Sequence, residues 1–456
     1  MGEHNLYFDK DGYHRGQVEG VEVLSGKNSA VTDINLVLST GVEGFIRLVS
    51  GETFSDTVSV PIIVGATEDA VLMKVSEIAT FDNTSWDPIV TTLTYNFETG
   101  GEKTLYVKFA DANGLESSPY SLDLTVYELY SHSLSIARKA MGSVVSGNLV
   151  FFAGGTSINW TAQVDIFDYS TNRWRSEEIS HARSHIATAA AGGKVVFAGG
   201  TDPVQALDIV DIYDLSSGSW TTGNLSAARY GSLALAVNGK ILIASGFGTS
   251  DAVRSVVDIY DTASGVWSTA SLAQLRGHMA GAVVGGKAYF AGGHVNSSGY
   301  SNLMEIYDAS SNSWLSTTIP NARAAMAAGV HGSLIYFSGG NAGGTLSNVV
   351  DIYDTVNGTW DSATLSQARS GIKTRTLGNK IFFAGGFASG GKSNIIDVLD
   401  VDSGYWSVLT LSEGVGDHSV ETVGDIVIFA GGETGSGATD MINIFDSQTG
   451  EVSSRY

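Results

Sequence analysis

Short apolar runs separated by glycine or polar turns recur from residue 135 to the C-terminus. In residues 276–314, the segment AVVGGKAYFAGG contains two such runs joined by a glycine turn, and LMEIYD forms a third run before a polar turn and Trp314. Runs of five or six residues bounded by turn signals are typical of antiparallel strands. The pattern therefore predicts a small meander of strands, which has to pack against further units to bury both faces of its sheet.

Four markers repeat in phase with this unit, at intervals of 45 to 47 residues. A glycine pair ends the second run, beginning at Gly154, Gly199, Ser245 (as Ser-Gly), Gly292, Gly339, Gly385 and Gly431. An arginine opens the units at Arg138, Arg183, Arg229, Arg276, Arg323 and Arg369. A tryptophan follows the polar turn at Trp174, Trp220, Trp267, Trp314, Trp360 and Trp406. An acidic pair closes the third run, as in Asp165 with Asp168, Asp211 with Asp214, Asp258 with Asp261, Glu305 with Asp308, Asp351 with Asp354, and Asp397 with Asp400.

The markers resemble those of the kelch repeat, which has a hydrophobic strand, Gly-Gly, a variable loop, a strand ending in Tyr-Asp, then Trp and Arg. The resemblance spans residues 135–456. It implies an all-β fold in which each repeat is a four-stranded blade of a β-propeller. Seven repeats imply a seven-bladed kelch β-propeller over residues 130–456. A propeller is a scaffold, so the resemblance leaves the activity open.

The seventh unit departs from the pattern, as terminal repeats commonly do. It has Val415 in place of the arginine, Asn443 in place of the first acidic residue and Val452 in place of the tryptophan. We predict that Gly450 to Tyr456 supplies the outer strand of the last blade. The alternative is residues 129–134, because LYSHSLSIAR (129–138) aligns with WTTGNLSAAR (220–229).

Residues 41–129 contain apolar runs such as FIRLV, AVLMKVS and KTLYVKFA, with turn signals every 8 to 14 residues. This spacing is typical of an immunoglobulin-like β-sandwich. The segments MKVSEIATFDNTSWDP and GEKTLYVKFADANGLES are similar to bacterial Ig-like domains, in which Trp86 and Tyr106 would be packing residues. The resemblance implies a spacer module in a cell-surface protein.

Residues 1–40 are similar to the second half of a carboxypeptidase-regulatory-like β-sandwich, on Gly12-Tyr13, residues 21–23, Gly26 and residues 34–36. We therefore expect the chain to start within a longer protein. Asp9-Lys10-Asp11-Gly12 also partly matches a calcium-loop motif, but no glutamate follows at the EF-hand spacing. A hairpin turn is the preferred interpretation of this segment.

The composition limits the function classes. The 25 basic and 47 acidic residues give a net charge of −22, which argues against binding to nucleic acid or an anionic membrane surface. The chain has no cysteine, which excludes disulfides, thiolate metal sites and a cysteine nucleophile. There is no apolar run long enough to cross a membrane as a helix. The bacterial-looking modules lead us to expect an extracellular or cell-surface location, with any signal or anchor outside this chain.

Two motifs suggest chemistry that the repeat context argues against. Residues 386–393 match G-x-x-x-x-G-K-S, but a phosphate-binding loop needs a following helix, and NIIDVLD reads as a strand. The repeat arginines could form an anion-binding ring. Their recurrence once per unit favours a structural role instead, with hydrogen bonds to carbonyls of a neighbouring turn. The acidic pairs are interpreted as acceptors at turns and strand ends.

His185 and His278 stand two residues after a repeat arginine, Asp417 holds the equivalent place in unit seven, and His418 follows it. These side chains could form a metal site at the channel mouth. Units two, four and seven are spread around the ring, however, so we expect hydrogen-bonded or solvated histidines. No metal and no cofactor is predicted.

We expect any ligand at the end of the propeller that carries the loops after the double glycines and the turns into each arginine. Loop positions that break the repeat are free to carry function. These candidate ligand-binding residues are Trp160, Asp202, Arg254, His294, Tyr300, Lys392 and Glu433. Trp160 and Tyr300 suit stacking on a sugar or anchoring a protein partner.

The sequence thus favours a non-enzymatic interaction or adhesion protein that binds a protein or glycan ligand. One alternative is a structural subunit of a surface layer or filament, with neighbouring subunits as partners. Another is a carbohydrate-active enzyme that uses the propeller face. Several charged side chains converging on the channel mouth would favour the enzyme, whereas the sequence shows only scattered ones.

Overall fold

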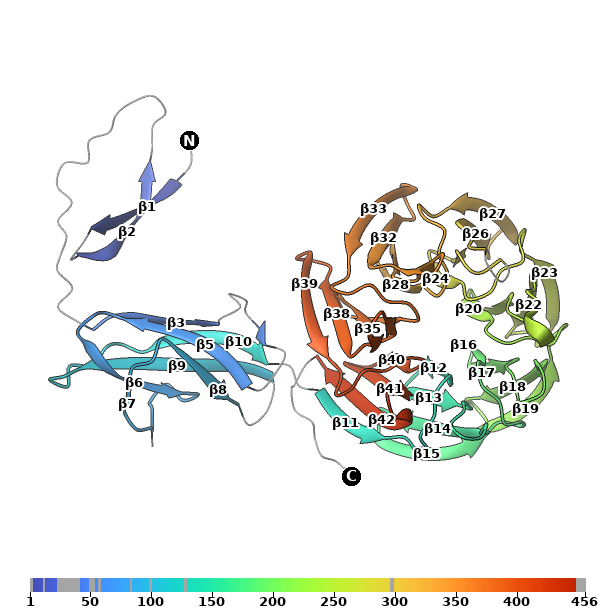
Figure 1. Cartoon of the computed structure of the whole chain (residues 1–456), viewed down its shortest axis with the longest axis horizontal. Coiled ribbons are helices and arrows are strands. Elements are labelled where there is room, and N and C mark those ends of the chain that lie inside the picture. Colours follow the sequence, from blue (N-terminus) through green and yellow to red (C-terminus); the bar gives the residue numbers. More distant parts are fainter. Residues whose placement is uncertain are drawn as a thin grey trace. The chain divides into compact units, whose positions relative to one another are not determined.

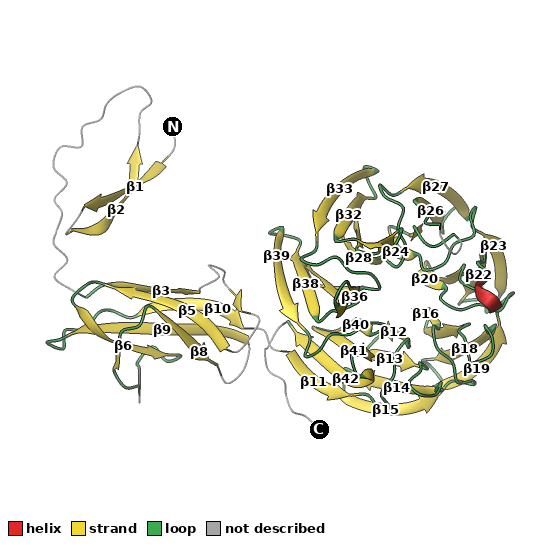
Figure 2. Ribbon diagram, in the orientation of Figure 1, coloured by secondary structure: helices red, strands yellow, loops and turns green. Residues whose placement is uncertain are grey.

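The structure is a computed structural model that describes residues 3–10, 13–22, 42–48, 54–55, 59–82, 84–97, 101–126, 129–295 and 299–447. Strands and turns account for nearly all of these residues, and the one helical element among them is the 3-10 turn η1 (Thr249–Asp251) (Figure 2). The all-β fold class is confirmed. The chain divides into two compact units, Met1–Tyr127 and Glu128–Tyr456.

The first unit contains a hairpin and two sheets. Strands β1 (Glu3–Lys10) and β2 (Tyr13–Glu22) pair antiparallel on either side of Asp11 and Gly12, which are outside the described residues, as are Gly26 and residues 34–36. The two sheets have the orders β4-β10-β9-β6-β7 and β3-β5-β8. Their strands are β3 (Gly44–Leu48), β4 (Phe54–Ser55), β5 (Ser59–Ala66), β6 (Ala70–Ser76), β7 (Asp87–Pro88), β8 (Thr92–Asn96), β9 (Gly101–Asp111) and β10 (Tyr120–Val126).

The two sheets of the first unit share one apolar core. Ile46 and Ile62 of the three-stranded sheet are in the same buried cluster as Val107 and Phe109 of the five-stranded sheet. Alternation of buried and exposed positions along each strand places one face of each sheet inward. Trp86 packs under the ammonium group of Lys74, 4.7 Å from its ring centre. The Ig-like and carboxypeptidase-regulatory-like assignments stay predictions.

Among residues 129–447 as described, the second unit contains seven four-stranded antiparallel sheets. We number them sheets 1 to 7 after the repeat units. The innermost strands are β12 (Gly142–Ser146), β16 (Ala187–Ala191), β20 (Leu233–Val237), β24 (Ala280–Val284), β28 (Ala327–His331), β34 (Lys373–Leu377) and β40 (Ser419–Val423). The second strands are β13 (Leu149–Ala153), β17 (Lys194–Ala198), β21 (Lys240–Ala244), β25 (Lys287–Ala291), β29 (Leu334–Ser338), β35 (Lys380–Ala384) and β41 (Ile426–Thr434).

The two outer positions of each sheet follow in the same order. The third strands are β14 (Gln163–Asp168), β18 (Ile209–Asp214), β22 (Val256–Asp261), β26 (Leu303–Asp308), β32 (Val349–Asp354), β38 (Ile395–Asp400) and β42 (Gly437–Asp446). The outermost strands are β15 (Arg173–Glu178), β19 (Ser219–Asn224), β23 (Trp267–Ser271), β27 (Ser313–Thr318), β33 (Thr359–Thr364), β39 (Tyr405–Thr410) and β11 (Leu129–Ser133). The sheets stand side by side in a closed ring with their innermost strands around the centre (Figure 1).

Apolar residues between neighbouring sheets hold the ring together. The second and third strands read as almost unbroken buried runs, because each sheet has a neighbour on both faces. One cluster joins Phe151 of sheet 1 to Phe197 of sheet 2, and equivalent clusters continue around the ring to Ile428 of sheet 7 and Phe152 of sheet 1. A single repeat lacks these neighbours, which is why the array folds as a whole.

The strand that closes the ring comes from the N-terminal side of the repeats. Strand β11 pairs antiparallel with β42, in register from Leu129↔Phe445 to Ser133↔Met441. The prediction that residues 450–456 supply this strand is wrong, because β11 already occupies the outer edge of β42, and those residues are outside the described ones. Joining the two ends of the array in one sheet closes the ring and pairs the outer edge of β42.

The G-x-x-x-x-G-K-S segment forms a strand hairpin, as the repeat context predicts. Strands β36 (Phe387–Ala388) and β37 (Gly391–Lys392) pair with each other, and β38 follows directly. The equivalent loop of sheet 5 forms a similar hairpin from β30 (Asn341–Ala342) and β31 (Thr345–Leu346). No helix N-terminus is present at this described segment to receive a phosphate.

Candidate functional site

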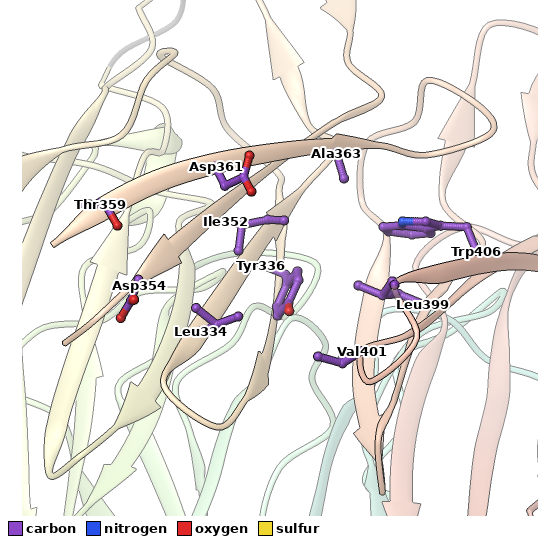
Figure 3. A pocket seen from close by; sticks show the side chains of 11 residues that line it. Leu334, Tyr336, Ile352, Asp354, Thr359, Asp361, Ala363, Leu399, Val401 and Trp406 are labelled. Atoms are coloured by element: carbon purple, nitrogen blue, oxygen red, sulfur yellow. The ribbon is translucent and has the colours of Figure 1, made fainter. Parts of the chain in front are cut away.

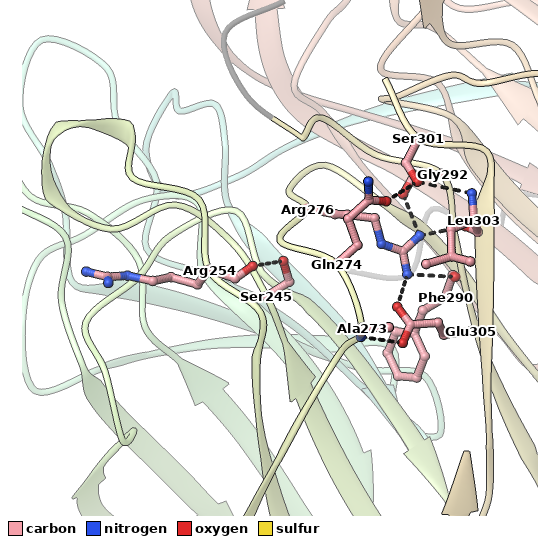
Figure 4. Close-up of polar contacts among 10 residues, drawn as sticks. All are labelled: Ser245, Arg254, Ala273, Gln274, Arg276, Phe290, Gly292, Ser301, Leu303 and Glu305. Carbon is pink, nitrogen blue, oxygen red and sulfur yellow. Dashed lines mark hydrogen bonds and ion pairs between the residues drawn. The ribbon is translucent and has the colours of Figure 1, made fainter. Parts of the chain in front are cut away.

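Each repeat arginine is buried and paired with the first acidic residue of its own unit. Arg276 is 0% exposed, and its Nη2 lies 2.7 Å from Glu305 Oε2 (Figure 4). The same guanidinium donates to the carbonyls of Gly292 and Leu303, at 2.9 and 2.6 Å. The same type of pair occurs in sheets 1 to 6, in Arg138–Asp165, Arg183–Asp211, Arg229–Asp258, Arg276–Glu305, Arg323–Asp351 and Arg369–Asp397.

These contacts confirm the structural role of the repeat arginines, because a guanidinium so enclosed has no face left for a ligand. Desolvation lowers the pKa of Arg276, and the nearby Glu305 carboxylate opposes that shift. The carboxylate also accepts the backbone N–H of Ala273 at 2.7 Å. The second acidic residue of each pair behaves differently. Asp308, for example, accepts backbone and hydroxyl hydrogen bonds from Ser310 in the following turn.

Sheet 7 has lost both charges of this pair together. Val415 is 2% exposed at the arginine position, and Asn443 is 3% exposed at the acidic position. The amide oxygen of Asn443 accepts from the backbone N–H and the hydroxyl of Ser412, at 3.3 and 3.0 Å. A buried carboxylate without its guanidinium would be an uncompensated charge. The paired substitution avoids this cost.

The loops after the double glycines meet the turns that follow the arginines, at one end of the sheets. Backbone bridges link Lys139 to Thr156 in sheet 1 and Gly277 to His294 in sheet 4. The second glycine of each pair permits this close approach. Gly155 has φ of 105°, and a Cβ there would lie 2.8 Å from the carbonyl oxygen of Lys139. We call this end of the ring the loop end.

Seven residues at the loop end encircle the centre of the ring, each two positions after the arginine site. They are Ala140, His185, Gly231, His278, Ala325, Gly371 and Asp417, and all have φ between 50° and 63°. Several are joined from sheet to sheet by backbone hydrogen bonds, such as His185 N to Ala140 O at 2.9 Å and Ala325 N to His278 O at 3.0 Å. In five of the seven, this left-handed conformation directs the N–H to the carbonyl of the equivalent residue in the preceding sheet. Five of the seven are not glycine, so the surrounding packing has to hold this uncommon conformation.

The side chains of this circle share one opening. His185, His278 and Lys373 are exposed to water, yet desolvation by the surrounding protein is the main cause of their lowered pKa values. These side chains are therefore accessible to solvent but have protein around them on several sides. Burial, together with the charges of His294 and His185, lowers the pKa of His278 to about 4. His278 is therefore neutral at physiological pH.

Lys373 is the unpaired cation of this opening within the described residues. Desolvation lowers its pKa, the Asp417 carboxylate opposes that effect, and Arg375 adds to it. The two histidines, Lys373 and Asp417 therefore act on one another electrostatically although they come from different sheets. The described residues include no group of three or more His, Asp or Glu side chains that could hold a metal ion.

A second charged group lies deeper, on the innermost strands of sheets 6 and 7. Arg375 donates from Nε and Nη2 to the two carboxylate oxygens of Glu421, at 3.0 and 2.7 Å. Ser143 of sheet 1 donates to the same carboxylate at 2.7 Å. Desolvation disfavours the charge of Arg375, but Glu421 raises its pKa overall. This bidentate pair ties three neighbouring inner strands together.

The structure brings two of the sequence-predicted residues into an aromatic row. The ring of Tyr300 lies 4.8 Å from that of His294, and His294 lies 5.8 Å from His278. Phe247 contacts both His278 and Tyr230, at 4.8 and 5.6 Å. Tyr230 in turn meets His185. The row Tyr230–Phe247–His278–His294–Tyr300 thus crosses the loop end over sheets 3 and 4 and borders the central opening.

Lys392 and Glu433 also come together. The Glu433 carboxylate lies 3.5 Å from Lys392 Nζ and 2.8 Å from Lys139 Nζ. Hydrogen bonding and charge from Lys139 lower the pKa of Glu433. This cluster spans the loop ends of sheets 6, 7 and 1.

The other three predicted residues contact neither group. Asp202 pairs with His181 at 3.3 Å and accepts the N–H groups of Val204 and Gln205, which gives it a turn-forming role. Arg254 is exposed, and its guanidinium points away from the buried cluster around Arg276 (Figure 4). Trp160 is half-buried, and its indole N–H lacks a hydrogen-bond partner among the described residues.

Sequence reasoning missed Lys373, Arg375 and Glu421. The other inner strands are small or apolar, such as ATAAA in β16 and AGAVV in β24, whereas β34 reads KTRTL and β40 reads SVETV. Charged residues at positions that face a central channel are the available signal. Comparing the first strands of all seven repeats would have revealed it.

His418 is the most thoroughly buried histidine of the loop end, and it gives a pH prediction. It is 2% exposed, so its imidazole is almost fully removed from water. Desolvation, followed by the charges of Lys373 and Arg369, lowers its pKa from 6.5 to about 3. It contacts Gly385 at the place where Met326 contacts Gly292 and Met141 contacts Gly431. Methionine is therefore the matched substitution.

We expect His418→Met to make the protein less sensitive to acid. Between pH 6.5 and about 3 the unfolded chain binds a proton at this position and the folded chain does not, so the wild-type free energy of unfolding falls as the pH drops. Between pH 7 and pH 4 the wild type should lose about 3 kcal/mol more than the variant. Urea unfolding at both pH values measures this difference, and parallel losses in the two proteins would contradict the prediction.

Comparisons with known proteins agree with this architecture. The family model described as KLHDC2/KLHL20/DRC7 Kelch-repeats domain matches residues 277–454, and the model described as Kelch motif matches residues 182–224. The solved structure titled "Structure of YjhT" has a TM-score of 0.50 and 16% sequence identity, over 61% of this chain and 99% of that chain. A search of curated proteins found no significant match. At this identity the structural match concerns the fold alone.

The closed ring of four-stranded sheets thus defines a β-propeller. The family models identify kelch repeats within residues 182–224 and 277–454. Among the described residues, the structure has no helix that is long and apolar enough to span a membrane.

Proposed function

We propose that this chain is a non-enzymatic interaction protein, in which a seven-bladed kelch propeller binds a protein partner at its loop end. The aromatic row Tyr230–Phe247–His278–His294–Tyr300 is the observation that carries the proposal. The first unit would act as an Ig-like spacer, and the protein would act at the cell surface or outside the cell. Kelch propellers in general suit protein binding, and a glycan is the other ligand class that such a row suits.

The chemistry of the row fits an interface. Tyrosine and other aromatic side chains dominate binding energy because they bury a large rigid area with little loss of side-chain entropy. All five members are only partly buried or exposed, although they pack against one another. The ring contacts already fix the conformations of these side chains, so a partner would not need to immobilise them. Preorganisation of this kind increases affinity.

The charged residues beside the aromatic row indicate which groups a partner would place there. Lys373 is a cation without an ion-pair partner within the described part of the chain, in a protein with a net charge of −22. The Lys139–Glu433–Lys392 cluster adds further charge beside the same opening. A partner that places a carboxylate or other anionic group over Lys373 would pair a partly desolvated charge. The aromatic row would then contact the neighbouring apolar surface of that partner.

The test compares the wild type with a loop-end variant in binding experiments. We expect His294→Ala/Tyr300→Ala/Trp160→Ala to weaken binding at least 10-fold in a pull-down with quantified affinity and on a glycan array. The matched control is Val266→Ala/Val356→Ala, which removes exposed apolar side chains (61% and 77% exposed) from turns at the opposite end of the sheets. Binding that survives the loop-end variant but not the control would refute the proposed face.

A second candidate, an enzyme acting on carbohydrate, is favoured by one observation. His185, His278, Lys373 and Asp417 converge on a single opening, and three of them have displaced pKa values. Such clusters are typical of catalytic sites as well as of binding sites. Turnover of any member of a glycan panel, abolished by Lys373→Met and by His278→Gln, would replace the interaction proposal with this one.

A further inference from the structure

Aromatic rings from the third strands fill the spaces between neighbouring sheets. Tyr213 of sheet 2 packs 5.4 Å from Phe151 of sheet 1, and Tyr353 of sheet 5 packs 6.2 Å from Tyr289 of sheet 4. The ring also contacts the tryptophan of its own sheet, as in the 5.0 Å separation of Tyr213 from Trp220. The equivalent residues around the ring are Phe167, Tyr213, Tyr260, Tyr307, Tyr353, Leu399 and Phe445.

Sheet 6 is the exception, because Leu399 stands where the other sheets have an aromatic residue. The side chain is buried, at 6% exposed, but it is shorter than the phenol ring that it replaces. The ring contact of Trp406 is with Phe383, at 5.4 Å, whereas the corresponding tryptophans of sheets 1 to 5 also contact the aromatic residue of their third strand. The space beside Trp406 is therefore left without a ring from this sheet.

The outer strand of the neighbouring sheet 5 brings only an aspartate and an alanine to the same place. In sheet 1, Arg175 donates to the hydroxyl of Tyr213 at 3.1 Å, and Glu177 accepts from the indole N–H of Trp220 at 2.6 Å. Counting from the tryptophan of the outer strand, the equivalents in sheet 5 are Asp361 and Ala363. What distinguishes this interface is thus the leucine of sheet 6, and neither Asp361 nor Ala363 is large enough to fill the space that it leaves.

A pocket of about 410 Å³ occupies this position between sheets 5 and 6 (Figure 3). Its floor and walls include Tyr336, Ile352, Leu399 and Trp406, and its rim carries the carboxylates of Asp354 and Asp361. Within the described chain, the pocket lining contains no basic residue. The volume is in the range of small ligand sites. A pocket with apolar walls and acidic acceptors favours an apolar group that donates a hydrogen bond.

We propose that this pocket receives a tyrosine side chain from a protein partner. The same cradle in sheets 2 to 5 holds a tyrosine of the chain itself, so its walls already have the shape for a phenol ring. The phenol O–H would donate to the Asp361 carboxylate, which accepts one other hydrogen bond, from the backbone N–H of Ser362 at 2.7 Å. In sheet 1 the hydroxyl of Tyr213 accepts from Arg175, whereas an aspartate at the equivalent position suits a hydroxyl that donates.

The pocket is distinct from the loop end. Leu334 pairs with Asp354, and Asp354 pairs with Thr359, at the end of sheet 5 opposite to the double glycine. All three residues line the pocket. The proposal therefore stands independently of binding at the loop end, and variants of the two sites separate them.

The test uses N-acetyl-tyrosine amide as a probe for a tyrosine within a polypeptide, with the full chain. We expect a saturable shift of the Trp406 indole N–H resonance in NMR titrations, at millimolar probe concentrations. N-acetyl-phenylalanine amide should bind about 5-fold more weakly, because it lacks the hydroxyl that donates to Asp361. Asp361→Ala changes an exposed side chain and should remove this preference while the fold is kept.

Leu399→Tyr is the decisive variant, because it restores the residue that sheets 2 to 5 carry. We expect it to abolish probe binding and to raise the melting temperature by filling the space from within. Undiminished binding in Leu399→Tyr, or no saturable shift in the wild type, would overturn the proposal. Free tyrosine binding more than 10-fold more tightly than the blocked amide would also overturn it, since that would indicate a small-molecule site.

Discussion

Replacing Arg276 with valine is expected to lower the free energy of unfolding by about 3 to 5 kcal/mol. The change leaves the carboxylate of Glu305, 3% exposed, without its counter-charge, and leaves the carbonyls of Gly292 and Leu303 without their donor. Urea unfolding followed by tryptophan fluorescence measures the loss. Surface pairs such as Lys287–Asp308, at 3.5 Å, provide the comparison, and Lys287→Met should cost less than about 1 kcal/mol.

Sheet 7 shows which second substitution should compensate for the loss of the arginine. Sheet 7 folds with Val415 and Asn443 at the two positions, so Arg276→Val/Glu305→Asn copies a natural arrangement. The new asparagine can accept the N–H of Ala273, as Asn443 accepts that of Ser412. We expect the double variant to be less destabilised than the sum of the two single variants by at least about 1 kcal/mol. Strict additivity would show that the two charges do not act as a pair.

Prolines in strand β11 are expected to open the ring. The bond from Leu134 N–H to Asp440 O, continued by antiparallel alternation, directs the N–H groups of Tyr130 and His132 toward β42. Tyr130→Pro/His132→Pro removes both donors and leaves the edge of β42 unpaired. We expect a loss of about 3 kcal/mol or more, seen as a fall of about 5 °C or more in the melting temperature of the propeller.

The matched control introduces two prolines in the C-terminal segment instead of in β11. Ser453→Pro/Arg455→Pro should leave the melting temperature unchanged, because β11 already pairs with the outer edge of β42. Calorimetry on the two double variants and the wild type separates the alternatives. A larger fall for the C-terminal prolines would mean that residues 450–456 close the ring after all.

Local features of the sequence were enough to predict the repeat, its strands and the carbonyl contacts of its arginines. They did not predict that the first acidic residue of each unit forms a buried ion pair with the arginine. A run of five apolar residues, a glycine pair and a Tyr-Asp end are short-range signals, and each is repeated several times in phase. The role of Arg276 could be predicted because the same residue recurs in six units, which a ligand contact would not require. The strand that follows Lys392 could be predicted for the same reason.

The candidate site was predicted only in part. His294 and Tyr300 come together because they are neighbours in one loop, and Lys392 meets Glu433 because equivalent loops of adjacent sheets lie side by side. Asp202 and Arg254 were chosen by the same rule of irregular loop positions, but Asp202 bonds within its own loop and the Arg254 guanidinium points away from the cluster around Arg276. A residue that breaks a repeat is therefore a weak indicator of function until its neighbours are known.

The sequence by itself determined the all-β class, the kelch repeats and the carbonyl contacts of the repeat arginines, since these depend on residues close together in the chain. The tertiary structure alone decided which strand closes the ring, since β11 and β42 are about 310 residues apart and either end of the array could complete the sheet. It also decided that Lys373, His185 and His278 share one opening and that Leu399 leaves a pocket beside Trp406. These features depend on what the neighbouring sheets place in the same space, and packing between sheets is a non-local property of the folded ring.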